Sequence, residues 1–169
     1  DLLENFILFD HSGGHTAKIL ARNHQYLGVT EAIKAYEARK LNNGKLGVFW
    51  HTQGSGKSYS MVFLAQKIRR KFTGSPTIVV LTDRDELNTQ ISDTFENCGI
   101  LGKAKASQFI ASSGDDLIDK LKGNPSFIFT LIQKFNKTDV EPIYPDHDIV
   151  IMSDEAHRSQ YGIFADNMV

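Results

Sequence analysis

The sequence predicts an α/β domain with a mainly parallel sheet and helices on both faces. Apolar runs of strand length alternate with segments whose apolar residues recur at helical spacing, as in chains of the strand–helix–strand type. A glycine-rich turn at residues 54–58 follows one of these runs, and an acidic pair at residues 154–155 follows another. The carboxyl ends of parallel strands lie at the same edge of a sheet, where ligands bind. Because both groups of polar residues follow such strands, we expect them at one ligand site.

The expected elements can be placed along the chain. A short amphipathic helix at residues 2–7 precedes a loop at Gly13-Gly14, and a second helix runs from about residue 23 to 40 and ends at Asn42-Asn43-Gly44. The apolar run at residues 46–50 is a strand, and the helix after the glycine-rich turn carries an apolar stripe: Met61, Leu64, Ala65, Ile68 and Phe72. Further strands are expected at residues 77–81, 126–130 and 149–152, and further helices at residues 87–95 and 115–121.

Composition limits the classes of protein to consider. The 169 residues suit one domain with a proper core, and the net charge of −1 provides no overall field to attract a polyanion. The single cysteine, Cys98, excludes an internal disulfide framework and fits a reducing cytoplasm. No apolar run has the length needed to span a membrane, and none resembles a signal peptide. We therefore expect a cytoplasmic protein whose contacts with nucleic acid are local.

The glycine-rich turn, Gly54-Ser55-Gly56-Lys57-Ser58, has the composition of a loop that binds phosphate. Glycine lets backbone N–H groups turn toward an anion, and the dipole of the following helix adds positive potential. We expect Lys57 to contact the β- and γ-phosphates of a nucleotide and Ser58 to ligate Mg²⁺. The general pattern has a further glycine where His51 stands. A plain flexible turn is the alternative, and the strand before the turn and the amphipathic helix after it argue against that.

The acidic pair opens a second motif, Asp154-Glu155-Ala156-His157, after the apolar run at residues 149–152. In phosphoryl transfer, carboxylates at such a strand end hold Mg²⁺ and activate water. We assign Asp154 to the metal, through a water molecule, and Glu155 to the attacking water, whose proton it takes. A solvated strand end is the alternative, but a buried parallel strand and the upstream phosphate loop favour a chemical role.

The chain resembles the motor (restriction) subunit of type I restriction-modification enzymes, which are helicase-like DNA translocases of superfamily 2. The resemblance runs from about residue 5 to 162, and its most specific part is the continuation of the acidic motif into Arg158-Ser159-Gln160-Tyr161-Gly162. Three other segments are similar to family motifs: Asp83-Arg84 with Leu87 and Gln90, Ile132-Gln133-Lys134-Phe135, and Ala21-Arg22 with His24-Gln25-Tyr26. Ser153 and Leu131 depart from the family pattern.

This resemblance implies a RecA-like P-loop NTPase lobe, with ATP and Mg²⁺ as cofactors, that drives ATP-dependent translocation on double-stranded DNA before cleavage. Residues 1–20 would be a linker or helix from a preceding nuclease domain that this chain lacks. Residues 21–169 would be the first motor lobe, truncated after the acidic motif. The intact protein would be a type I site-specific deoxyribonuclease subunit that assembles with modification and specificity subunits. The isolated lobe would be inactive, because a second lobe supplies the arginine finger.

The resemblance also implies roles for single residues. Gln25 corresponds to a glutamine that reads adenine, and a planar amide can pair with N6 and N7 of that base. His157 is similar to a residue that couples the nucleotide to a neighbouring motif. Residues after the strands at the carboxyl edge of the sheet would meet the DNA backbone without reading its sequence: Thr82, Arg84, Thr130, Gln133 and Lys134. The basic residues of the helix after the glycine-rich turn are better explained as a solvated face: Lys67, Arg69, Arg70 and Lys71.

Two alternatives remain open. The chain could belong to another superfamily 2 motor, such as a type III restriction subunit or a DNA or RNA helicase, and the continuation at residues 158–162 argues against this. It could also be a nucleotide-binding module without turnover, although a degenerate site would be expected to lose Glu155.

Overall fold

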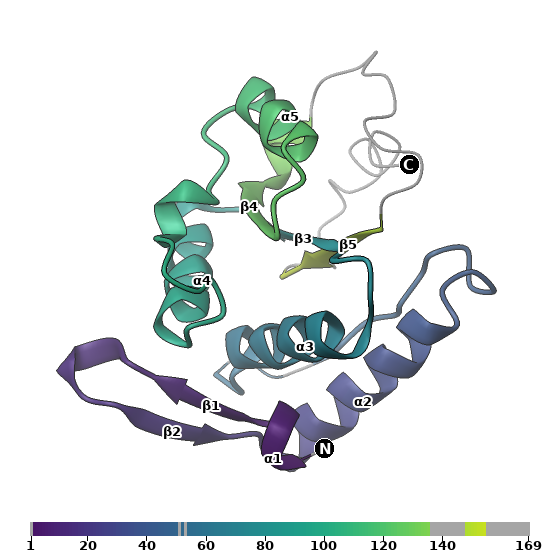
Figure 1. Ribbon diagram of the computed structural model, residues 1–169, viewed down its shortest axis with the longest axis vertical. Helices are drawn as coiled ribbons and strands as arrows, with labels where there is room; N and C mark the ends of the chain where they lie inside the picture. Colours follow the sequence, from purple (N-terminus) through teal and green to yellow (C-terminus); the bar gives the residue numbers. More distant parts are fainter. Residues whose placement is uncertain (1, 51, 53, 136–147, 155–169) are drawn as a thin grey trace.

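The computed structural model describes residues 2–50, 52, 54–135 and 148–154. Within them, three strands form a parallel sheet in the order β4-β3-β5 (Figure 1). The strands are β3 (Thr77–Thr82), β4 (Phe127–Leu131) and β5 (Ile149–Ser153). The central strand is buried along its whole length, and its Val79 pairs with Ile128 on one side and Ile151 on the other. The parallel sheet predicted from the sequence is confirmed.

Helices lie on both faces of this sheet, as predicted (Figure 1). One face packs in the larger core against α2 (Asn23–Glu37), α3 (Lys57–Lys71) and α4 (Asp85–Asn97). The other face packs against α5 (Gly114–Lys122). Successive residues of β3 alternate between the two cores, with Ile78 in the larger and Val79 in the smaller, as the pleat of a strand requires.

The helix that follows the glycine-rich turn, α3, is buried more broadly than its predicted stripe. Ala65 and Ile68 of the stripe are buried, whereas Met61, Leu64 and Phe72 are only partly buried. Val62 and Phe63 lie outside the stripe and are fully buried. The helix contacts α2 on one side and the core on the other, and a helix enclosed in this way needs more than one apolar face.

The N-terminal region differs from the prediction of one helix at residues 2–7. The helix α1 is only Leu2–Asn5, and the chain then forms an antiparallel hairpin of β1 (Ile7–Asp10) and β2 (Ala17–Leu20). Phe6 is fully buried at the bend between α1 and β1. From there burial alternates with period two along β1, which is a strand pattern that a helical spacing of apolar residues can imitate over so few residues. The hairpin extends to one side of the lobe (Figure 1).

The segment at residues 46–50 does not form the predicted strand. Strand geometry needs a neighbouring ladder for its N–H and C=O groups, and within the described residues β5 pairs only with β3. Val48 and Trp50 are consequently exposed, at 79% and 84%. Side chains hold the segment instead: Leu46 packs against the larger core, and the ring of Phe49 lies on Gly28 of α2.

The boundaries of the other helices and strands lie close to those predicted from the sequence. α2 ends at Glu37, earlier than predicted, and turns lead to Asn43 and Gly44, whose φ angles are 49° and 76°. Short 3₁₀ turns occur at Ser12–Gly14, Ala106–Gln108 and Ile132–Phe135. Among the helices of the described residues, none has the length and apolar character to cross a membrane.

Candidate nucleotide-binding site

The predicted phosphate loop forms a tight turn at the start of α3. Gly54 and Gly56 have φ angles of 75° and 87°, in the left-handed region that residues with a Cβ avoid. Gly56 is the N-cap of α3, so Lys57 and Ser58 occupy its first turn, where backbone N–H groups are not used within the helix. Those N–H groups and the helix dipole suit an anion such as a nucleotide phosphate.

Gln25 holds this loop from α2. Its side-chain Nε2 donates to the carbonyl oxygen of Gly56 at 3.0 Å, and its Oε1 accepts from the backbone N–H of Arg22 at 2.9 Å. The Gln25 side chain is buried, with 4% of the residue exposed. Adenine pairing stays a prediction. It would use the second N–H and the second lone pair of an amide that already bridges two backbone groups.

Two more contacts join α2 to the loop and to the segment that precedes it. Nε2 of His24 lies 3.3 Å from the carbonyl oxygen of Ser55. A Cβ placed on Gly28 would lie 1.5 Å from a ring carbon of Phe49, so the aromatic ring occupies the space that a side chain at this position would fill. His24 was predicted only as part of the segment around Gln25, and Phe49 only as part of a strand; neither contact followed from these predictions.

A cavity of about 430 Å³ brings the two predicted motifs together. It is lined by α2, by residues 46–49, by the start of α3 and by the end of β5, and both Lys57 and Asp154 contribute to its wall. The backbone N–H of Asp154 donates to the carbonyl oxygen of Leu81 at 3.0 Å, which fixes the chain as it leaves β5. Glu155 and His157 lie outside the described residues.

Residues of this cavity and of the adjoining glycine-rich turn fit a nucleotide with Mg²⁺. Ser58 offers a hydroxyl and Asp154 a carboxylate, which are oxygen ligands of the kind that Mg²⁺ takes, in small number, beside substrate phosphates. Within the loop, the hydroxyl of Ser55 is buried without a hydrogen-bond partner among the described residues. A buried polar group of this kind is more stable with a partner, and a bound phosphate would offer one.

Comparison with known proteins identifies the family. Residues 24–169 match the family model described as SWI2/SNF2 ATPase, and this range contains the phosphate loop, the supporting helix α2 and Asp154. The chain belongs to the SWI2/SNF2 ATPase family. It is a helicase-like lobe, as the resemblance implied.

Relatives of this SWI2/SNF2 ATPase lobe carry restriction-enzyme names. The chain is 41% identical, over 96% of its length, to the type I restriction enzyme HindI endonuclease subunit of Haemophilus influenzae. It is 35% identical, over 99% of its length, to a protein of Methanocaldococcus jannaschii named as the type I restriction enzyme MjaIXP endonuclease subunit. The chain spans 16% of the length of each of these relatives.

The residues predicted to contact DNA fall into two groups in the ATPase lobe. Thr82 and Thr130 are buried at the ends of their strands, and their hydroxyls lie 3.4 Å from the carbonyl oxygens of Arg84 and Leu131. Arg84 and Gln133 are exposed. Gln133 donates from Nε2 to the carbonyl oxygen of Asp83 at 3.1 Å and so joins the two loops that follow β3 and β4.

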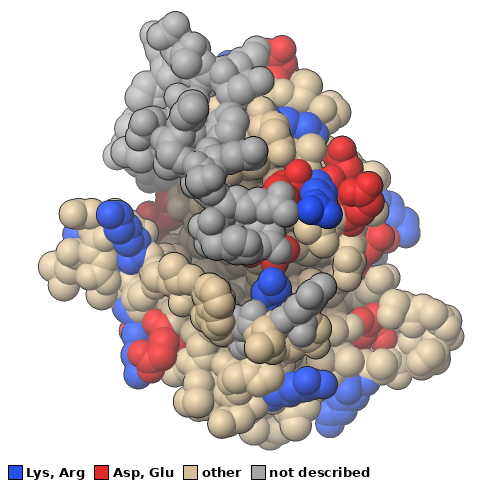
Figure 2. Space-filling view, turned by 180° about the vertical axis from the view of Figure 1, so that it is seen from behind, with Lys and Arg blue, Asp and Glu red and all other residues tan. Residues whose placement is uncertain are grey.

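Lys134 follows Gln133 in the turn after β4. Nζ of Lys134 donates to the carbonyl oxygen of Ala111 at 2.5 Å, so the ammonium group already has a hydrogen-bond partner within the fold. On the face drawn in Figure 2, basic and acidic side chains are interspersed, as expected for a net charge of −1. Local groups such as Arg84 remain the better candidates for phosphate contacts.

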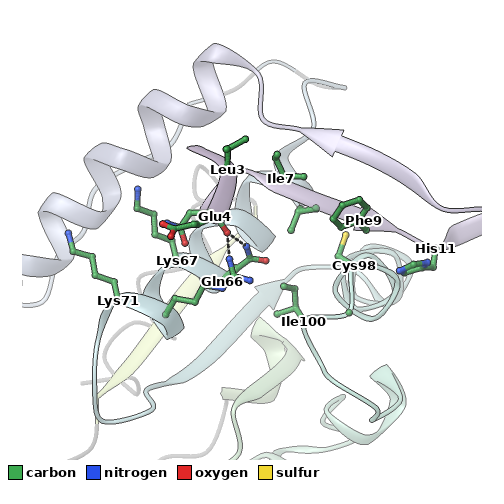
Figure 3. A pocket seen from close by; sticks show the side chains of 14 residues that line it. Leu3, Glu4, Ile7, Phe9, His11, Gln66, Lys67, Lys71, Cys98 and Ile100 are labelled. Carbon is green, nitrogen blue, oxygen red and sulfur yellow. Dashed lines mark hydrogen bonds between the residues drawn. The ribbon is translucent and has the colours of Figure 1, made fainter. Parts of the chain in front are cut away.

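A second, larger cavity of about 1060 Å³ lies away from the phosphate loop (Figure 3). It is lined by residues of α1, β1 and α3, and the α3 residues include Gln66, Lys67 and Lys71. Lys67 is buried, with its ammonium 4.6 Å from the ring centroid of Phe6. For Lys67 the expectation of a solvated helix face is therefore wrong: the side chain covers an aromatic ring in the core.

Proposed function

We propose that this chain is the ATP-hydrolysing motor lobe of a type I restriction endonuclease subunit, and that it drives translocation on double-stranded DNA. The observation that carries the proposal is the meeting of Lys57 and Asp154 at one cavity, beside a phosphate loop that Gln25 holds in place. Membership of the SWI2/SNF2 ATPase family and the names of the relatives support the choice of ATP and of a restriction system.

The phosphate loop would bind the nucleotide. Backbone N–H groups at the start of α3 would surround the β-phosphate, because the positive φ angles of Gly54 and Gly56 turn the chain around an anion. Lys57 would place its ammonium against the β- and γ-phosphates, where charge grows during transfer. Gln25 would keep the Gly56 peptide in place and would read N6 and N7 of adenine with its second N–H and lone pair.

The first turn of α3 and the residues that follow β5 would supply the hydrolytic groups. The Ser58 hydroxyl and, through water, the Asp154 carboxylate would hold Mg²⁺, which neutralises phosphate charge when it is bound. Glu155 follows Asp154 directly and would orient the attacking water and take its proton. His157 would couple the occupied site to a neighbouring motif.

Several further parts of the proposal concern the longer protein. Cleavage would belong to a nuclease domain outside this chain, and residues 1–20 would lead from it into the lobe. Modification and specificity subunits would be partners, and a reducing cytoplasm suits a chain with one cysteine. Arg84, with Gln133 and Lys134, would contact the phosphate backbone of the DNA.

Binding without turnover is the second candidate for the chain on its own. The family resemblance implies that an arginine from a second lobe completes the site, and arginine fingers contribute about 10³–10⁵ in rate where they have been measured. Without closure over the γ-phosphate, water weakens each charged contact. We therefore expect this chain alone to bind Mg·ATP weakly and to hydrolyse it negligibly.

Steady-state phosphate release tests the proposal. The full-length protein that contains this chain should hydrolyse ATP and should do so faster when duplex DNA is added. Glu155→Gln should abolish turnover but keep ATP binding, because the amide retains the shape of the side chain and loses only the base. Loss of ATP binding in Glu155→Gln would show that Glu155 has been given the wrong role.

A further inference from the structure

The β1–β2 hairpin is hydrogen-bonded to the helix that carries Lys57 and Ser58. At the end of β1, Oδ2 of Asp10 accepts a hydrogen bond of 2.5 Å from the hydroxyl of Tyr59. Tyr59 directly follows Ser58 and stands in the first turn of α3. No motif of the sequence pointed to either residue, because 49 positions separate them.

The Asp10 carboxylate is buried and is held by more than one donor. Only 5% of the residue is exposed, and Oδ1 also accepts from the backbone N–H of Ser12 at 2.7 Å. Burial acts to raise the pKa of Asp10, but the hydrogen bonds from Tyr59 and Ser12 outweigh it, so that the pKa of this carboxyl lies below its usual value. A buried charge is tolerated only with such partners, which makes the Tyr59 hydroxyl difficult to replace.

Tyr59 also lies against the phosphate loop. A Cβ placed on Gly56 would lie 3.9 Å from a ring carbon of Tyr59 and 3.0 Å from Nε2 of Gln25. Gly56 is therefore enclosed by Gln25 from α2 and by Tyr59 from its own helix. The hydrogen bond to Asp10, followed by burial, raises the pKa of Tyr59 to about 12, so the hydroxyl keeps its proton and remains the donor.

The same corner of the hairpin touches a second helix. The backbone N–H of His11 donates to the carbonyl oxygen of Asn97 at 3.1 Å, at the last residue of α4. The N-cap of α4 is Arg84, a candidate for contact with DNA phosphates. The turn end of the hairpin thus has a hydrogen bond to α3, beside the phosphate loop, and another to α4.

We propose that Asp10 and Tyr59 are positioning residues through which the β1–β2 hairpin sets the geometry of the phosphate loop for ATP. The inference rests on the proposed function. The bond holds the first turn of α3 in place before a nucleotide binds, so its loss weakens ATP binding more than turnover at saturation. Whatever contacts and moves the hairpin therefore changes the affinity of the lobe for ATP.

The test uses Tyr59→Phe in the full-length protein, because phenylalanine keeps the ring and removes only the hydroxyl. We expect the KM for ATP to rise by about tenfold while kcat changes by less than about twofold, the size expected for one hydrogen bond to a charged group. Asp10→Ala should raise KM similarly. The double variant should be no worse than Tyr59→Phe alone, since both changes break the same bond.

Tyr36→Phe is the matched control. It removes a second tyrosine–aspartate hydrogen bond, which runs from Tyr36 of α2 to Oδ2 of Asp148 at 3.4 Å. This change should leave the KM for ATP unchanged. A KM in Tyr59→Phe equal to that of the wild type would overturn the inference, as would an equal rise in Tyr36→Phe. A wild-type protein that neither binds nor hydrolyses ATP would instead overturn the proposed function.

Discussion

The side-chain amide of Gln25 donates a hydrogen bond of 3.0 Å to the carbonyl oxygen of Gly56, the N-cap residue of the phosphate-loop helix. The sequence predicted a glutamine that faces a base, and the structure adds a glutamine that supports the loop. Both roles use Nε2 and Oε1 of one amide, but each uses a different hydrogen and a different lone pair. They can be separated by experiment, because loop support affects every nucleotide and base pairing affects only one.

Gln25→Ala should weaken both ATP and GTP binding, with the loss for ATP about tenfold larger. Support of the loop accounts for the shared loss, and a pairing worth about 1–3 kcal/mol accounts for the extra loss. Competition binding of the two nucleotides measures both. Gln66→Ala is the control, since Gln66 is also buried and also donates to a backbone carbonyl, that of Glu4 at 3.2 Å. Unchanged GTP binding would argue against loop support, and equal losses would argue against adenine pairing.

Gly28→Ala should destabilise the fold, although alanine is the better helix former by about 1 kcal/mol. The new Cβ would meet the Phe49 ring at 1.5 Å, and overpacking of this kind costs about 1–3 kcal/mol. Thermal unfolding measures the effect. In a Phe49→Ala background the same substitution should be neutral or stabilising. Destabilisation of equal size in both backgrounds would exclude the ring contact as the cause.

Asp116 should contribute to stability only above acidic pH. Its carboxylate accepts from Nζ of Lys120 at 2.8 Å and from the backbone N–H of Ser112 at 2.7 Å, and these bonds lower its pKa from 3.8 to about 2. Because the folded-state pKa is the lower one, the contribution is present above pH of about 4 and is lost as the pH falls toward 2.

Unfolding by denaturant across this pH range measures the Asp116 contribution. Asp116→Asn should flatten the dependence of the unfolding free energy on pH between about 4 and 2. Asp119→Asn changes an exposed carboxylate of the same helix and serves as the control. A wild-type slope that survives in Asp116→Asn would assign the dependence to other groups.

Local patterns were sufficient to predict the strands of the parallel sheet, the helices α2, α3, α4 and α5, and the tight glycine-rich turn before α3. β3 and α4 are examples, because a buried apolar run and a helical stripe are properties of neighbouring residues. The strand predicted at residues 46–50 was wrong, since a strand needs a partner and the apolar run does not contain one. The hairpin at residues 7–20 was missed because α1 and β1 are too short for their periods to differ clearly.

The contacts that position the site could not be predicted from sequence, because they join distant residues. Gln25 and Gly56 are 31 positions apart, and Asp10 and Tyr59 are 49 positions apart. Sequence motifs indicate Gln25 and Gly56 separately, but only the fold shows that Nε2 of Gln25 contacts the carbonyl oxygen of Gly56. The contact between Gly28 and the ring of Phe49 likewise joins residues that no pattern of the sequence links.

Phosphate release from Mg·ATP by the full-length protein with duplex DNA, measured for the wild type and Lys57→Ala, tests the central claim most directly. Lys57 would contact phosphates in both the ground state and the transition state, so its loss should lower turnover by at least about a hundredfold. Lys71→Ala is the control, since it removes a lysine at the other end of the same helix. Turnover in Lys57→Ala equal to that of the wild type would contradict the assignment of this lobe as an ATP-hydrolysing motor.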